Sequence, residues 1–335
     1  MGYIKHLIAA TAFAAALIPS GAFAQIKERT LRFTTQNVAS SPQGLGMTRF
    51  AELVKEKSGG KINIRTFPAG QLGGDLQNVS AVQGGTLDFV LLNAGLLVGL
   101  DKRFAALDLP FLFNNPEEAD KIVDGPIGEK LHKSLEDKGL VGLSFWELGF
   151  RNVTNSKHPI AKLEDFKGLK LRVLQSPLFI ELFNGLGANS VAMAFPEVYT
   201  ALEQRVVDGQ ENPYPTILGN KFQEVQKFVS ETKHIYNAQS LLMSKKLWDQ
   251  LSPDEKALFQ AAAKEAQGFQ RKTSREAQAA ALADLQKGGM IANRISDAEM
   301  ARIREAAKPV IEKFSNEVAP DLVKEINAAL AAGRK

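Results

Sequence analysis

Two arginines carry the most distinctive chemistry of this sequence. Arg172 lies in an alternating stretch, G-L-K-L-R-V-L, where the pattern points its side chain away from the face that Leu171 and Val173 bury. Arg151 stands among apolar and small residues, in F-W-E-L-G-F-R-N-V-T. A guanidinium binds a carboxylate through two parallel hydrogen bonds. Either arginine alone is typical of a surface or salt-bridged side chain, but two that begin neighbouring strands of one lobe favour an organic-acid site.

Two further residues follow Arg172 in the sequence and suit the same site. Asn212 precedes Pro213, which holds it in an extended or turn conformation. Its amide can donate a hydrogen bond to a ligand oxygen, although a plain turn accounts for it equally well. Phe195, in M-A-F-P-E, suits a ligand wall but, taken alone, is more typical of a hydrophobic core.

No set of residues for catalysis or metal binding accompanies these arginines. The sequence has no cysteine, and its four histidines lie far apart without metal-ligand spacing. It has no G-x-S-x-G elbow, no Walker loop and no complete G-x-G-x-x-G after a strand. The sequence therefore predicts binding without catalysis, cofactor or metal. A periplasmic hydrolase or isomerase is the less favoured alternative.

The N-terminus is typical of an export signal. An apolar run follows Lys5 and His6, and Ala22-Phe23-Ala24 has the form of a signal-peptidase site, so residues 1–24 are predicted to be a cleaved signal peptide. That run and every later apolar stretch are shorter than the ~20 residues that a membrane helix needs. The net charge of +4 is mild, and the charges are mixed in sign, which argues against nucleic acid as a partner. We expect an exported, soluble protein.

The chain after the signal alternates strand and helix patterns. Strands are predicted near 31–33, 62–64 and 87–92, with helices near 47–54 and 75–83 between them. This order predicts a largely parallel sheet covered on both faces, where ligands bind at the carboxyl ends of the strands. Those ends are Gln36-Asn37 and Asn93-Ala94.

A second unit is predicted to begin near Gly149, with strands near 151–154 and 169–174 and a return to the first unit near 237–243. Ser252-Pro253-Asp254-Glu255 is a capping box that begins a helix running to Gly288. At 1.5 Å per residue this helix measures roughly 50 Å, which is long enough to span two lobes. Ser296 with Glu299 begins the next helix, which Pro309 is expected to kink or end.

Over nearly its whole length after the signal, the chain resembles the DctP-type solute-binding proteins of tripartite ATP-independent periplasmic (TRAP) transporters. The motifs that carry the resemblance, in chain order, are F-A-E-L-V-K-E-K-S-G-G-K-I, Q-L-G-G-D, G-L-K-L-R-V, A-F-P-E-V-Y-T-A-L-E-Q, V-D-G-Q-E-N-P and K-F-Q-E-V-Q-K-F. The last four, in this order and spacing, are highly specific.

The resemblance implies an α/β fold of the two-lobed, type II-like periplasmic-binding-protein kind, joined by hinge strands and a long helix. Residues 25–148 with 238–277 then form one lobe, and 149–237 with 278–335 form the other. The family's ligand arginine falls on Arg172, and a second arginine common in many members falls on Arg151. The remaining implied ligand contacts are Phe195, Asn212, Glu211, Asn37, Asn93 and Trp146.

The function implied is capture of a small organic acid in the periplasm and its delivery to the small and large membrane subunits of a TRAP system, by a protein expected to be monomeric. A C4-dicarboxylate and a sugar or hydroxy acid both remain open. Sialate is disfavoured because Leu92-Asn93 stands where sialate binders carry a glutamate, and the E-N-P loop differs from that of metal-assisted members. A sensory partner of a signalling receptor is the alternative outside transport.

Overall fold

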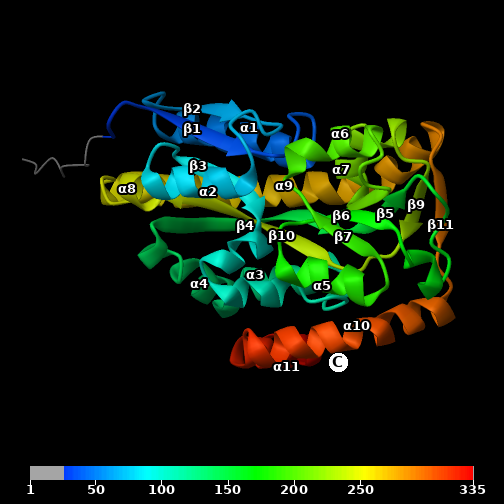
Figure 1. Ribbon diagram of the computed structural model, residues 1–335. Coiled ribbons are helices and arrows are strands. Elements are labelled where there is room, and N and C mark those ends of the chain that lie inside the picture. The colour runs from blue at the N-terminus through cyan, green and yellow to red at the C-terminus, as the bar shows by residue number, and fades with distance from the viewer. Residues whose placement is uncertain (1–25, 335) are drawn as a thin grey trace, which may run out of the picture.

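The computed structural model describes residues 26–334 and shows two sheets side by side, covered by helices (Figure 1). The predicted signal peptide lies outside the described residues. Within residues 26–334, no helix combines the length and the apolar character needed to cross a membrane. The sheet built mainly from the first part of the chain is called lobe I below, and the other sheet lobe II, each with the helices that cover it.

The sheet of lobe I has the strand order β2-β1-β3-β10-β4. Its strands are β1 (Arg29–Thr35), β2 (Ile62–Phe67), β3 (Phe89–Asn93), β4 (Leu140–Phe150) and β10 (Tyr236–Ser244). The predicted strand–helix alternation is confirmed, and β1 pairs in parallel with both β2 and β3. The sheet is nevertheless mixed, because β10 returns from lobe II and pairs antiparallel with β3 and β4.

Helices cover the sheet of lobe I, and an aromatic cluster packs the first of them against it. The helices are α1 (Pro42–Lys57), α2 (Asp75–Gly84), α3 (Pro116–Val123), α4 (Pro126–Lys133) and α8 (Lys245–Trp248), with 3-10 turns η1 (Ala94–Gly99), η2 (Lys102–Asp108) and η3 (Glu136–Lys138). The ring of Phe50, on α1, lies 5.8 Å from Phe33 and 5.4 Å from Phe89, centroid to centroid. Such edge-on aromatic pairs contribute packing beyond the apolar area they bury.

The sheet of lobe II has the order β11-β9-β5-β8-β6-β7. Its strands are β5 (Asn152–Asn155), β6 (Lys170–Val173), β7 (Asn189–Ala192), β8 (Gly209–Asn212), β9 (Phe228–Glu231) and β11 (Ile291–Arg294). Its helices are α5 (Pro177–Gly185), α6 (Val198–Glu203) and α7 (Tyr214–Gly219), with 3-10 turns η4 (Leu163–Phe166), η5 (Phe195–Glu197) and η6 (Phe222–Glu224). The two arginine-bearing segments are not neighbours, because β8 pairs with both β5 and β6 and separates them.

Two strand connections and one helix join the lobes. The chain passes from β4 to β5 at Arg151 and from β9 back to β10 near Ile235, and the Arg151 amide donates to the Ile235 carbonyl at 2.9 Å. Gly149 has a φ of +110°, which is strained for any residue with a side chain. A Cβ there would also lie 2.8 Å from Nε2 of Gln278. The crossing point therefore depends on this glycine.

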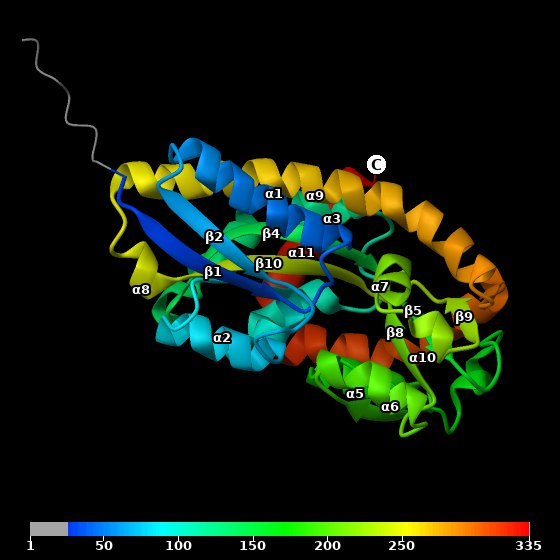
Figure 2. The same cartoon turned by 90° about the horizontal axis from the view of Figure 1, so that it is seen from above.

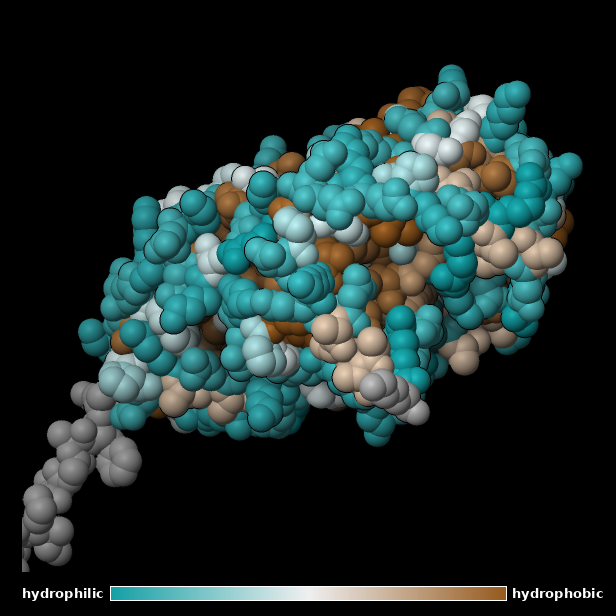
Figure 3. All heavy atoms as spheres, turned by 90° about the horizontal axis from the view of Figure 1, so that it is seen from below, coloured by the Kyte–Doolittle hydropathy of each residue, from teal (hydrophilic) through white to brown (hydrophobic). Residues whose placement is uncertain are grey.

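The long helix α9 (Pro253–Lys287) confirms the predicted capping box: Ser252 Oγ accepts from the Glu255 amide at 3.2 Å. Figure 2 shows α9 running beside α1 and on past lobe II. Two more helices follow, α10 (Asp297–Glu317) and α11 (Pro320–Gly333). Pro309 lies inside α10 and does not end it. In Figure 3, hydrophilic side chains cover most of the face seen from below, and apolar ones gather near its middle.

The two C-terminal helices contact both lobes. Lys313 of α10 pairs with Glu181 of α5 in lobe II, at 2.8 Å. Glu325 of α11 pairs with Lys130 of α4 in lobe I, also at 2.8 Å. The lobe boundaries in the chain stay a prediction, and these contacts show that residues after 297 are shared between the two sheets.

Candidate functional site

A cavity of about 30 Å³ lies between the lobes. It is lined by Gln36, Asn37, Asp75, Asn93, Leu148, Arg151, Arg172, Leu174, Phe195, Asn212, Thr216 and Gln239. Six of the residues predicted as ligand contacts are therefore brought together here, namely Arg172, Arg151, Asn212, Phe195, Asn37 and Asn93. The other two, Glu211 and Trp146, are not on its wall.

Strand direction explains why the lobe II residues meet. Because β5 runs antiparallel to β8 and β6 runs parallel to it, the start of β5 lies at the same sheet edge as the ends of β8 and β6. Asn152, next to Arg151, pairs with Asn212 across this edge. Arg172 is the third of the four residues of β6 and so lies near the end of its strand, not at its beginning.

Arg172 is held from one side and keeps donors for a ligand. Its Nε and one terminal nitrogen donate to the Met193 carbonyl, at 3.1 and 2.6 Å, and its Cζ lies 5.7 Å from the centroid of the Phe195 ring. A guanidinium has five N–H donors, so three remain without a protein acceptor among residues 26–334. Burial lowers the pKa of Arg172 to about 10, which still leaves it charged at neutral pH. It can therefore bind a carboxylate bidentately.

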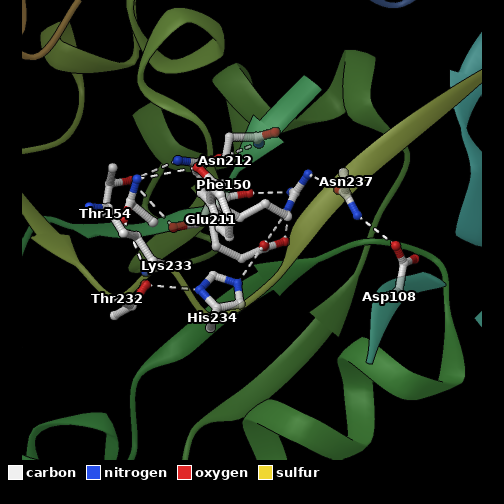
Figure 4. A network of polar contacts seen from close by, with 12 residues as sticks. Asp108, Phe150, Thr154, Glu211, Asn212, Thr232, Lys233, His234 and Asn237 are labelled. Atoms are coloured by element: carbon white, nitrogen blue, oxygen red, sulfur yellow. Dashed lines mark hydrogen bonds and ion pairs between the residues drawn. The ribbon is translucent and has the colours of Figure 1, made fainter. Parts of the chain in front are cut away.

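Figure 4 shows a polar network that includes Glu211 and Asn237. Arg151 is buried in this network, which uses most of its donors. It forms a very short ion pair with Glu211 through Nε, a further bond of 2.8 Å to the same carboxylate, and a short bond to the Glu211 carbonyl. The last partner is Asn237 Oδ1, at 2.7 Å. Glu211 is thus the counter-charge behind Arg151, and only one N–H of Arg151 is left for the cavity.

His234, in the connection between β9 and β10, completes this network. Its Nε2 lies 3.0 Å from Glu211 Oε2 and its Nδ1 2.8 Å from Thr232 Oγ1. Burial lowers the pKa of His234, so the ring is neutral near pH 7, with Nε2–H donating to the carboxylate. Burial alone would raise the pKa of Glu211, but Arg151 and His234 outweigh it and lower that pKa. The network therefore pairs the positive charge of Arg151 with the negative charge of Glu211.

The lobe I wall consists of amide side chains at the predicted strand ends. Asn37 donates to Gln239 Oε1, and Gln239 donates to Asn93 Oδ1, both at 3.3 Å. Gln36 donates to the Gly73 carbonyl at 2.8 Å, while its Oε1 is buried without a partner among the described residues. Amide groups donate and accept, so this wall suits a ligand with several hydroxyls.

Asp75 is a cavity residue that the sequence analysis missed. It is the first residue of α2 and the last of the Q-L-G-G-D motif. It is half-buried, and its Oδ1 is fully buried without a hydrogen-bond partner in the described part of the chain. Burial raises the pKa of Asp75 to about 7, against the opposing charge of Arg172. The motif carried the signal, but an acid at a helix start is also a common capping residue.

Trp146 belongs to the core of lobe I and does not line the cavity. It is 1% exposed, its Nε1 donates to Ser144 Oγ at 3.0 Å, and its ring lies 6.4 Å from that of Phe33. A bulge follows Trp146: Glu147 pairs with Ala238 and Gly149 with Asn237, which leaves Leu148 as an extra residue. Leu148, nearer the end of β4, lines the cavity.

Comparison with known proteins decides the family. Residues 33–317 match the model of the bacterial extracellular solute-binding proteins, family 7, the DctP family. The chain belongs to this family. The predicted resemblance is thereby confirmed, and so is the two-lobed α/β fold.

Relatives of this family 7 protein are named for acids. The 2,3-diketo-L-gulonate-binding periplasmic protein YiaO of Escherichia coli is 38% identical over 78% of this chain and 80% of its own. The sugar acid binding protein of Advenella mimigardefordensis, solved with galactonate, is 41% identical with a TM-score of 0.90, covering 92% of this chain and 99% of that one. A TRAP periplasmic solute-binding protein from Ochrobactrum anthropi is 52% identical, with a TM-score of 0.81 over 92% and 96% of the two chains, and has its C-terminus bound in its ligand-binding pocket.

Proposed function

We propose that this family 7 protein captures a sugar acid with a single carboxylate in the periplasm and delivers it to the membrane subunits of a TRAP transporter. The observation that carries the proposal is the pairing of one available cation, Arg172, with one acidic side chain, Asp75, in the same cavity. The rest of the lining consists of amide, hydroxyl and apolar groups and of Arg151, which is already paired with Glu211.

The charges of the cavity favour one carboxylate over two. Arg172 offers three free N–H donors, whereas the charge of Arg151 is neutralised by Glu211. A second carboxylate on the ligand finds no second free cation on this wall. A carboxylate that is buried without a counter-charge loses its hydration and gains no ion pair in return. Succinate and related C4-dicarboxylates are therefore disfavoured.

Hydroxyl groups fit the same wall. Each hydroxyl both donates and accepts, so it satisfies either the free Oδ1 of Asp75 or the free Oε1 of Gln36. The relatives named for 2,3-diketo-L-gulonate and for galactonate support this class of ligand. An acid without hydroxyls leaves those buried oxygens unpaired, which costs binding free energy.

The lobes meet over the cavity, which supports capture by closure. A β-carbon added to Gly70 of lobe I would lie 3.1 Å from Cγ of Pro196 in lobe II, and one added to Gly219 of lobe II would lie 3.1 Å from Cγ2 of Val38. A ligand enters only when the lobes separate. Reclosure excludes water and strengthens the guanidinium–carboxylate pair.

Titration calorimetry with galactonate and galactarate tests the proposal. The two acids share a carbon skeleton and differ at C6, where galactarate has a second carboxylate. We expect heat of binding with galactonate and at least about tenfold weaker binding of galactarate, equivalent to roughly 1.4 kcal/mol. Tighter binding of galactarate or succinate than of galactonate would show that the ligand is a dicarboxylate.

A further inference from the structure

A second, larger chamber lies directly outside the cavity that contains Arg172. It measures about 300 Å³, against about 30 Å³ for the inner cavity. The two share Gln36 and Phe195 as common walls. A water molecule needs about 10–15 Å³ of such space, so the inner cavity, with the lobes as they stand, has room for about two or three waters. An acid that is longer than this space can extend into the adjoining chamber.

Both lobes contribute to this outer chamber. Gln36 and Ala69 come from lobe I, and a segment around η5, α6 and η6 comes from lobe II. Two of its residues, Ala69 and Lys221, have φ angles of +54° and +57°, which residues other than glycine rarely adopt. Such strained positions gather at ligand sites, where the surrounding structure fixes them.

The lining of the chamber combines aromatic faces with a polar rim. Phe195, Tyr199 and Phe222 supply the rings, and the centroids of Phe195 and Phe222 lie 6.0 Å apart. Asn220 and Lys221 lie on the same wall, and the Tyr199 hydroxyl donates to Glu224 at 2.9 Å. The C–H face of a sugar ring is apolar and its edge carries hydroxyls, so this lining fits a pyranose. A few polar groups among apolar and aromatic ones are typical of small-molecule sites.

Gln36 and Phe195 connect the two spaces chemically. Phe195 contacts residues of both spaces: its ring centroid lies 5.7 Å from Cζ of Arg172 and 6.0 Å from the centroid of Phe222. Gln36 is 7% exposed, and its Oε1 accepts no hydrogen bond from residues 26–334. A ligand hydroxyl beside Gln36 can donate to this oxygen.

We propose that the outer chamber is a second sugar subsite, which binds a sugar ring attached glycosidically to the acid that Arg172 holds. This inference rests on the proposed function, since it assumes that the carboxylate is bound at Arg172. The ligand class it names is the glycosylated aldonic acid: a monocarboxylic sugar acid that carries one further pyranose.

The test compares gluconate with three of its glycosides, lactobionate, cellobionate and maltobionate, by calorimetry on the full chain without its signal. We expect at least one glycoside to bind at least about tenfold more tightly than gluconate, because a buried ring adds apolar contact with the aromatic wall. Tyr199→Ala is expected to remove that advantage and to leave gluconate affinity within about twofold. Tyr199→Phe, which keeps the ring, is expected to retain it.

Glu203→Ala is the matched control, because Glu203 is exposed on the same helix and does not line the chamber. Thermal unfolding of each variant checks that it folds. The subsite is overturned if all three glycosides fail to bind while gluconate or galactonate binds, or if Tyr199→Ala leaves glycoside affinity unchanged; the proposed function survives either result. Absence of binding for every acid, bare or glycosylated, overturns the proposed function and the subsite with it.

Discussion

Arg151 and Arg172 border the same cavity but differ in how much hydrogen-bonding capacity they have left. Arg151 makes four hydrogen bonds to Glu211 and Asn237, whereas Arg172 makes two, both to the Met193 carbonyl. Of five donors each, one remains on Arg151 and three on Arg172. We therefore propose separate roles for the two arginines: Arg172 anchors the ligand, and Arg151 positions the strands at the crossing between the lobes.

Removing the charge of Glu211 should destabilise the protein. Glu211→Gln leaves Arg151 buried without a counter-charge, which costs about 3–5 kcal/mol. The pKa of Glu211 is lowered in the folded state, so its contribution is present above the ordinary value of 4.5 and is lost as the pH falls through the lowered pKa. Urea unfolding should therefore give a lower free energy of unfolding for Glu211→Gln than for wild type at pH 7, and the difference should shrink in acid. Glu203→Gln, on the exposed face of α6, should have no comparable effect.

Ligand affinity should rise as the pH falls from about 8.5 to 6. Burial raises the pKa of Asp75 to about 7, and an anion bound at Arg172 raises it further, because it repels the carboxylate and offsets the charge of Arg172. Binding then takes up a proton, and each unit of added shift is worth up to about tenfold in affinity. Calorimetry across this range should show that affinity rises as the pH falls in wild type and stays constant in Asp75→Asn. A slope that persists in the variant would assign the titration to another group.

The crossing point between the lobes should not tolerate a side chain at Gly149. Gly149→Ala forces a Cβ into a backbone with φ of +110°, close to Nε2 of Gln278. We expect a loss of about 1–3 kcal/mol in the free energy of unfolding. Gly268→Ala, inside α9 with open space around it, is the control and should be neutral or stabilising. Equal effects of the two substitutions would contradict the strain.

A lysine should not replace Arg172. Its ammonium has no planar fork, so it cannot bind a carboxylate bidentately and keep two donors on the Met193 carbonyl. Arg172→Lys should weaken galactonate binding by at least about tenfold, while thermal unfolding in the absence of ligand changes little. Calorimetry that gave equal affinities for Lys and Arg would mean that charge alone holds the acid.

The sequence predicted those residues of the site that lie in clear local patterns of strand, turn or helix. Arg172 could be placed because its strand alternates clearly, and Phe195 and Asn212 follow it within one lobe. Gln239 could not be placed from the sequence, because it lies 146 positions after its hydrogen-bond partner Asn93 and reaches it only through the return of β10. Trp146 was expected to contact the ligand, but it packs in the core beside Phe33, and Leu148 lines the cavity. Asp75 was hidden by its second role as an acid at a helix start.

The most direct test of the account is calorimetric titration of galactonate into wild type, Arg172→Ala and Arg294→Ala. Arg294 is an exposed arginine on β11 of the same sheet and serves as the matched control. Removing one partner of a desolvated charge pair costs about 2–5 kcal/mol, so Arg172→Ala should bind roughly 30-fold more weakly or not at all, with its fold intact. Arg294→Ala should bind like wild type. Near-unchanged affinity of Arg172→Ala for galactonate would contradict the central role of Arg172.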